Sequence, residues 1–151
     1  MAFGLRQHTK TKEEEIHKIV AEKLHAVGLD GIEEMMPNDL SGGMKKRVSL
    51  ARAVALNPKI ILYDEPTAGL DPVRSNDISR LIKAMQESMH PLSVVVTHDM
   101  ESAFSVADRM VYLENGRFEM IGTTEEFKNT TNEKVRYFIT GGKEGREGGE
   151  R

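Results

Sequence analysis

The run Ile60-Ile61-Leu62-Tyr63-Asp64-Glu65-Pro66 decides the fold of this chain. Its unbroken apolar stretch before two carboxylates is typical of a short strand buried on both faces, as in a parallel sheet. Side chains alternate along a strand, so Asp64 and Glu65 start in different directions from its end. One carboxylate can then face a metal ion while its neighbour faces a reacting water. The run therefore predicts a buried strand with a candidate chemical site at its carboxyl end.

The segments around this strand alternate between helical and extended patterns. Thr11 and Glu14 have capping-box spacing, and the helix that they predict stops at Gly28. Further amphipathic helices are expected over residues 41–56, 71–89 and 100–107, and further strands over residues 92–96, 110–113 and 118–121. This alternation predicts an α/β chain with a mostly parallel sheet and flanking helices. Residues before about 40 predict no strand and are interpreted as part of a helical subdomain.

Local turn and cap signals organise the C-terminal part of the chain. Asn115-Gly116 separates two apolar runs and predicts a tight β-hairpin. Thr123 and Glu126 have the spacing of a second capping box. Residues 141–151 contain only Gly, Glu, Lys and Arg, so we expect a disordered tail there. The expected divisions of the chain are residues 1–57, 58–140 and 141–151.

Composition excludes several classes of protein. The 151 residues include no cysteine, which excludes a disulfide framework, a thiolate zinc site and a cysteine nucleophile. Lys and Arg number 21 against 24 Asp and Glu, and a net charge of −3 argues against a nucleic-acid binder held by bulk electrostatics. No apolar run approaches the roughly 20 residues that span a bilayer. The N-terminus has no apolar signal-peptide region, so we expect a cytoplasmic chain.

A candidate anion site lies at the start of the helix that follows Ser41. Helix N-termini present amides without intrahelical partners and a favourable dipole to an anion. The Ser41 hydroxyl adds a polar group, and Gly42 and Gly43 let a phosphate approach the main chain. Basic residues 45–47 follow in the first turns. The pattern also fits a plain helix cap with glycines in the turn, and both interpretations stay open.

The other candidate residues follow strand ends, and each also has a structural interpretation. Asp64 could bind Mg²⁺ through water, because this ion prefers oxygen ligands and keeps several waters. Asp64 and Glu65 also fit an acidic pair at a solvated strand end. His98 follows the expected strand at 92–96, where a lone histidine is usually a packed or capping residue. Asp71 alone predicts only a loop and a helix cap.

The order of these segments resembles the nucleotide-binding domain of ABC transporters. Residues 40–53 resemble its signature motif, and residues 60–66 resemble its Walker B strand. Residues 68–72 and 94–99 are similar to its D-loop and its switch-histidine segment. The resemblance covers about residues 1–141. It implies the fold of the C-terminal half of an ABC-type P-loop NTPase domain, with part of the helical subdomain.

The resemblance implies ATP hydrolysis with Mg²⁺ and gives a role to each matching residue at the strand ends. Asp64 would hold Mg²⁺ through water. Glu65 would orient or deprotonate the attacking water, and His98 would hold the γ-phosphate and the water in line. Catalysis of this kind depends on positioning and charge stabilisation more than on covalent chemistry.

The resemblance also implies a homodimer, or pairing with a complete ATPase subunit, that encloses ATP between subunits. Ser41, Gly42 and Gly43 would contact ATP held by the opposite subunit, and Asp71 would couple the two sites across the dimer. A transmembrane permease would be the other partner, with no nucleic acid involved. The chain would lie on the cytoplasmic face of the inner membrane without inserting into it.

A finer resemblance concerns the ATPases of Mla/Mce phospholipid transport. It rests on the Ser-Gly-Gly-Met form at residues 41–44 and on residues 122–127 and 135–141. The ATPases of polar amino-acid importers share much of this pattern. The implied function is therefore ATP-driven transport, with phospholipid as the expected substrate.

The chain contains no G-x-x-x-x-G-K-[ST] motif, because the one Gly-Lys pair, Gly142-Lys143, has Tyr137 at the position of the first glycine. We expect these residues alone to bind ATP poorly and not to hydrolyse it. A sheet that lacks the strand before that motif would expose an apolar edge and face.

Two other functions stay open. A non-catalytic interaction protein could pair with a complete ATPase subunit and offer Ser41 and Gly43 to its ATP. The C-terminal lobe of a chromosome-maintenance or DNA-repair ATPase is disfavoured, because no long heptad segment precedes residue 40.

Overall fold

The structure is a computed structural model that describes residues 1–142. Its contacts divide the chain into two units, Met1–His98 and Asp99–Arg151. The expected division at residue 57 stays a prediction. Of the expected disordered tail, Gly141 and Gly142 form a turn, and residues 143–151 lie outside the described residues.

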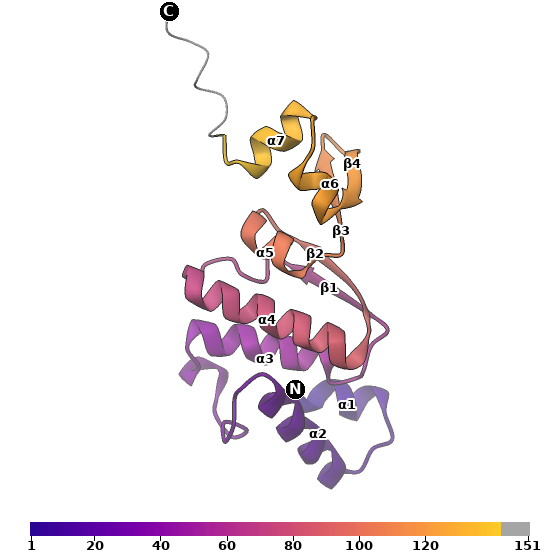
Figure 1. The fold of residues 1–151 in the computed structure, drawn as a ribbon. Helices are drawn as coiled ribbons and strands as arrows, with labels where there is room; N and C mark the ends of the chain where they lie inside the picture. The colour runs from indigo at the N-terminus through magenta and orange to yellow at the C-terminus, as the bar shows by residue number, and fades with distance from the viewer. Residues whose placement is uncertain (143–151) are drawn as a thin grey trace, which may run out of the picture. The chain divides into compact units, whose positions relative to one another are not determined.

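The first unit contains three helices of 13–18 residues, two shorter helices and a pair of strands. Its elements are α1 (Ala2–His8), α2 (Glu13–Ala26), the 3₁₀ helix η1 (Pro37–Asp39), α3 (Gly42–Val54), β1 (Ile60–Asp64), α4 (Pro72–Met89) and β2 (Leu92–Val96). Within this unit, α3 and α4 lie side by side (Figure 1).

The second unit is built around a β-hairpin. Its elements are α5 (Met100–Val106), β3 (Arg109–Glu114), β4 (Arg117–Thr123), α6 (Thr124–Lys128) and α7 (Glu133–Ile139). Within residues 1–142, no helix combines the length and the apolar character needed to cross a bilayer.

β1 and β2 form a parallel pair, as the alternation of helices and strands predicts. The register places Asp64 beside Val96, so the carboxyl ends of both strands meet at the same edge. The helix that connects the strands, α4, is fastened to β2 by a hydrogen bond from Ser93 Oγ to Gln86 Oε1 of 2.8 Å. The side chains that follow the two strands are therefore brought close together.

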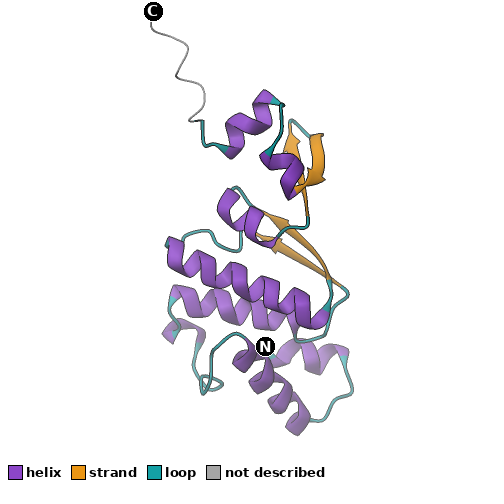
Figure 2. Cartoon of the chain, viewed as in Figure 1, coloured by secondary structure: helices purple, strands orange, loops and turns teal. Residues whose placement is uncertain are grey.

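The prediction that β1 is buried on both faces is wrong for this structure. Ile61 and Tyr63 are buried, whereas their neighbours Ile60 and Leu62 are exposed. Within the first unit, the helices lie on one side of the strand pair (Figure 2). The other side exposes 46–75% of each of five apolar residues, Ile60, Leu62, Leu92, Val94 and Val96. We call these five residues the open sheet face.

The expected Thr11/Glu14 capping box is also wrong. The N-cap of α2 is Lys12, which makes no side-chain cap hydrogen bond. Three glutamates, residues 13–15, occupy the first turn instead, where their charge complements the helix dipole. The helix stops as predicted before Gly28, whose φ of +68° is readily adopted only by glycine.

The second unit confirms the hairpin prediction. β3 and β4 pair in antiparallel fashion, and the connecting Asn115 and Gly116 have φ angles of 50° and 74°. Positive φ at both central residues is the requirement of a type I′ turn. The core of this unit is formed by Met110, Phe127 and Val135. Residues 1–142 thus contain one parallel and one antiparallel strand pair.

The Thr123/Glu126 capping box predicted at the start of α6 is confirmed. The Glu126 amide donates to Thr123 Oγ1 at 3.2 Å, and Glu126 Oε2 accepts from the Thr123 amide at 2.6 Å. The main-chain hydrogen bond from Thr123 is the largest cause that holds the pKa of Glu126 below its ordinary value of 4.5. This lowered pKa stabilises the folded state above about pH 4.5, and the stabilisation is lost as pH falls through the lowered pKa.

Glu126→Gln is therefore expected to remove part of the acid sensitivity of the second unit, because the amide of Gln can accept the same hydrogen bonds but does not titrate. Urea unfolding at about pH 7 and about pH 3, followed by amide NMR signals of residues 99–142, measures the effect. Glu119→Gln, which changes an exposed carboxylate on β4, is the matched control. Equal losses of stability in wild type and Glu126→Gln would contradict the prediction.

The open sheet face is expected to cause self-association, because apolar patches of this kind are rare on monomeric proteins. The double variant Leu62→Lys/Val96→Lys should lower the weight-average mass that sedimentation equilibrium gives at high protein concentration. It should not lower the urea midpoint of unfolding. Lysines on α4 in place of exposed polar residues, such as Asn76→Lys, control for net charge. Self-association that the face variant leaves unchanged would show that this surface is not responsible.

Candidate functional site

Glu65 follows β1 directly, and the main chain turns there. Its φ of 45° lies in the left-handed region, which is unfavourable for a residue with a side chain. The Glu65 amide donates to the Val96 carbonyl at 2.9 Å and so extends the ladder between β1 and β2. The Glu65 carbonyl accepts from the Ala68 amide at 3.2 Å. Glu65 is thus the last residue paired with β2 and the first residue of the loop.

The Glu65 carboxylate lies against the loop that follows β2. Oε1 accepts a hydrogen bond from the His98 amide at 3.2 Å and lies 2.8 Å from His98 Nδ1. The Thr97 hydroxyl donates to Oε2 at 3.4 Å. The Glu65 side chain is 33% exposed and the His98 side chain is 76% exposed. The structure therefore brings the two predicted catalytic residues together at the carboxyl ends of the parallel strands.

The contacts of Glu65 determine its protonation state. The side-chain hydrogen bond with His98 is the largest cause that holds the pKa of Glu65 below its ordinary value of 4.5, and partial burial acts in the opposite direction. The carboxylate is therefore ionised at neutral pH. A general base works best when its pKa is near the working pH, so a lowered pKa makes Glu65 a weak proton acceptor. An ionised carboxylate can accept a hydrogen bond from a water and so orient it.

Asp64, the predicted magnesium ligand, ends β1 with an exposed side chain. Among residues 1–142, no group of three or more His, Asp or Glu side chains could hold a metal ion. Mg²⁺ commonly uses one or two carboxylates and keeps several waters when it binds with a nucleotide. Asp64 therefore fits this ion as a single protein ligand, directly or through water.

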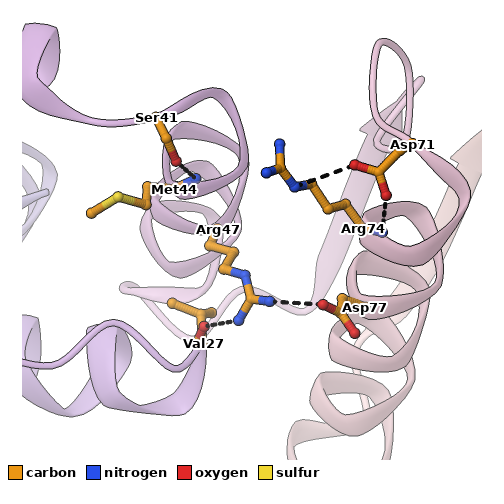
Figure 3. A network of polar contacts seen from close by, with 7 residues as sticks. All are labelled: Val27, Ser41, Met44, Arg47, Asp71, Arg74 and Asp77. Atoms are coloured by element: carbon orange, nitrogen blue, oxygen red, sulfur yellow. Dashed lines mark hydrogen bonds and ion pairs between the residues drawn. The ribbon is translucent and has the colours of Figure 1, made fainter.

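The predicted anion site at the start of α3 is open. The Ser41 side chain caps the helix by accepting from the Met44 amide at 3.3 Å (Figure 3). A Cβ atom built on Gly42 would meet no atom within 4 Å, and one built on Gly43 would meet only Arg74 Cδ at 4.0 Å. A phosphate can therefore approach the first amides of α3 without a steric barrier. The residues fit a nucleotide phosphate.

Two of the basic residues in the first turns of α3 do not serve this anion site as expected. The Arg47 guanidinium donates to the Val27 carbonyl at 3.0 Å and to Asp77 Oδ2 at 3.2 Å (Figure 3). Arg47 thus ties the end of α2 and the middle of α4 to α3. Lys46 Nζ donates to the Glu65 carbonyl at 3.2 Å. Both cations are used inside the first unit, where they hold elements together.

Asp71, predicted to act across a dimer, caps α4 in this structure. Asp71 Oδ1 accepts from the Arg74 amide at 3.0 Å, and Asp71 Oδ2 lies 3.3 Å from Arg74 Nε. Arg74 is not among the predicted site residues, although its position three residues after a cap is a usable signal for this ion pair. A cavity of about 370 Å³ is lined by Ser41, Gly43, Arg74 and the Arg47–Asp77 pair. These pairs balance in charge, so anion binding here depends on the amides and hydroxyl of the α3 turn.

Comparison with known proteins assigns the family. The ABC transporter family model matches residues 2–68. Over 140 residues the chain is 46% identical to the probable ribonucleotide transport ATP-binding protein mkl of Mycobacterium leprae, covering 93% of this chain and 40% of that protein. It is 41% identical over 145 residues to the intermembrane phospholipid transport system ATP-binding protein MlaF of Haemophilus influenzae, covering 96% and 55%.

This chain has the same fold as about half of a solved structure. The structure of cbiO1 from Clostridium perfringens, part of the ABC transporter complex cbiONQ, has a TM-score of 0.75 and 33% identity. The match covers 83% of this chain and 49% of that one. The chain spans about half the length of the curated relatives it matches. Its α/β fold is that of part of a P-loop NTPase domain, and the chain belongs to the ABC transporter ATP-binding family.

Proposed function

We propose that this chain supplies a water-orienting carboxylate and a phosphate contact to the ATPase of an ABC transporter. The observation that carries the proposal is the contact between Glu65 and His98 at the carboxyl ends of β1 and β2. Membership of the family supports ATP as the ligand.

The chemistry of the site is positioning and electrostatics. When bound, ATP with Mg²⁺ supplies the phosphoryl group and the positive charge that polarises it. Glu65 orients a water through its ionised carboxylate, which Thr97 and His98 hold in place. Asp64 contributes one ligand to the ion. His98, which contacts the Glu65 carboxylate, would help to hold the γ-phosphate and that water in place.

We further propose that the α3 turn acts on the nucleotide of a second subunit. The open approach to Gly42 and Gly43 and the cap at Ser41 support a phosphate contact there. Asp71, which is paired with Arg74 at the edge of the cavity, would respond to the second subunit through Arg74. Such a subunit needs two kinds of partner, a second ATPase subunit and a transmembrane permease. It would then lie at the cytoplasmic face of a membrane.

Phospholipid is the proposed transported substrate. The printed name of the Haemophilus influenzae relative describes intermembrane phospholipid transport, and the match covers 96% of this chain. The printed name of the Mycobacterium leprae relative describes ribonucleotide transport instead. The two names make different predictions, which a transport assay separates.

A second candidate function is a non-catalytic partner that offers only the α3 turn to another subunit's ATP. The open approach to Gly42 and Gly43 favours it, because a phosphate contact there needs no hydrolytic machinery in the same chain. In this function Ser41 matters for activity, whereas Glu65 does not.

A chimera tests the catalytic role of Glu65. This chain replaces the matching segment of Haemophilus influenzae MlaF, and ATP hydrolysis is measured on the purified chimera. Glu65→Gln keeps the side-chain shape but removes the charge that orients water, so we expect kcat to fall by roughly 10²–10⁴-fold. Glu87→Gln, an exposed carboxylate on α4, is the matched control and should leave kcat unchanged.

The same chimera separates the two candidate functions. Loss of activity in Ser41→Ala together with full activity in Glu65→Gln would support the non-catalytic partner and contradict the catalytic role. An active chimera whose rate falls only in Glu65→Gln would support catalysis within this chain's own site.

The chimera also tests the substrate. We expect it to restore phospholipid transport in a Haemophilus influenzae strain that lacks MlaF, because the surface that meets the permease is shared between close relatives. Transfer of labelled phospholipid between membranes is the measurement, and the Glu65→Gln chimera is the negative control. An ATPase-active chimera that restores no phospholipid transfer would contradict the proposed substrate.

A further inference from the structure

Lys46 joins the two parts of the proposed site within one chain. It lies in the second turn of α3, just after the turn that contains Ser41 and Gly43. Its Nζ donates a partly buried hydrogen bond of 3.2 Å to the carbonyl of Glu65, nineteen positions further along the chain. Its neighbour Lys45 is exposed. The two adjacent lysines therefore differ in their surroundings, although nothing in the sequence distinguishes them.

The main chain of Glu65 requires support from outside its own loop. Its φ of 45° is unfavourable for a residue with a side chain, and such conformations persist only where the surroundings fix them. The Val96 carbonyl holds the Glu65 amide, and the Ala68 amide holds the Glu65 carbonyl. Lys46 adds a second donor to that carbonyl, and this donor comes from helix α3 rather than from the loop itself.

The direction of the Glu65 carboxylate depends on this main-chain conformation. A change in the backbone torsions of Glu65 would swing the side chain away from Thr97 and His98, whose hydrogen bonds to it are 2.8–3.4 Å long. A hydrogen bond with a charged donor is stronger than one between neutral groups. The ammonium of Lys46 is thus a suitable group to hold a strained carbonyl in place.

We propose that Lys46 is a positioning residue that holds the Glu65 main chain so that its carboxylate meets His98. Because Lys46 lies on the helix that begins with the Ser41 turn, it also links the phosphate contact to the carboxylate. A displacement of α3 at its N-terminus would reach Glu65 through this hydrogen bond. The catalytic role of this link rests on the proposed function of Glu65. The predicted effect of Lys46 on the conformation of the Glu65 main chain does not depend on that function.

NMR on the full chain tests the proposal with four variants. Lys46→Met keeps most of the length of the side chain and removes the donor, Lys46→Arg keeps a charged donor, and Lys46→Gln keeps a neutral one. Lys45→Met, at the adjacent exposed lysine, is the matched control. The readouts are the intraresidue amide–Hα NOE of Glu65, which is strong at positive φ, and the ¹⁵N shift of His98 Nδ1. Glu65→Gln gives the His98 reference without the carboxylate.

We expect Lys46→Met to weaken the Glu65 NOE and to move the His98 signal by at least half of the difference between wild type and Glu65→Gln. Lys46→Arg should restore both signals, and Lys45→Met should leave them at wild-type values. Urea midpoints measured in parallel separate positioning from a general loss of stability. If Lys46→Met does not fold, the comparison of Lys46→Gln with Lys46→Arg replaces it.

Unchanged Glu65 and His98 signals in Lys46→Met, or equal changes in Lys45→Met, would overturn the proposal. Its failure is distinct from failure of the proposed function. Changed NMR signals with a fully active Glu65→Gln chimera would retain the positioning role and remove the catalytic one. The reverse pattern would retain the catalytic role of Glu65 and remove the role of Lys46.

Discussion

The hydrogen bond from the Glu65 amide to the Val96 carbonyl is the constraint on which the site depends. It extends the parallel register of β1 and β2 by one residue beyond the strands, so Glu65 must lie beside the residues that follow Val96. The left-handed turn at Glu65 then directs its carboxylate to Thr97 and His98. With its backbone fixed on both sides, the carboxylate has a defined position before any ligand binds. Preorganisation of this kind reduces the cost of orienting a water.

The same pair of strands exposes apolar side chains to water on the open sheet face. Parallel sheets are usually covered on both faces, whereas the helices of the first unit lie on one side of this pair (Figure 2). The exposed Ile60, Leu62 and Val96 belong to the same two strands that position Glu65. The sheet therefore carries both the proposed chemistry and an exposed apolar surface. The exposed face agrees with the expectation of an uncovered apolar side, and the curated relatives are about twice as long as this chain.

Much of the fold could be predicted because local rules act within a few residues. The Asn115-Gly116 hairpin, the caps at Ser41, Asp71 and Thr123, and the stop at Gly28 are all confirmed. The Thr11/Glu14 box failed because three consecutive glutamates offer an alternative start, and sequence spacing does not rank the two. The short helices α1 and α7 were not predicted, since seven residues give too little periodicity.

The site was predictable only in part. The position of His98 near Glu65 follows from two strand ends in a parallel pair, because chain order fixes which residues meet. The partners of Lys46, Arg47 and Arg74 could not be predicted. The partners of such long side chains depend on how the helices pack, which the sequence pattern does not show. The most direct measurement is a crystal structure of the MlaF chimera with a non-hydrolysable ATP analogue. We predict Glu65 bonded to His98 with an ordered water between its carboxylate and the γ-phosphate; a carboxylate turned away from both would contradict the proposed function.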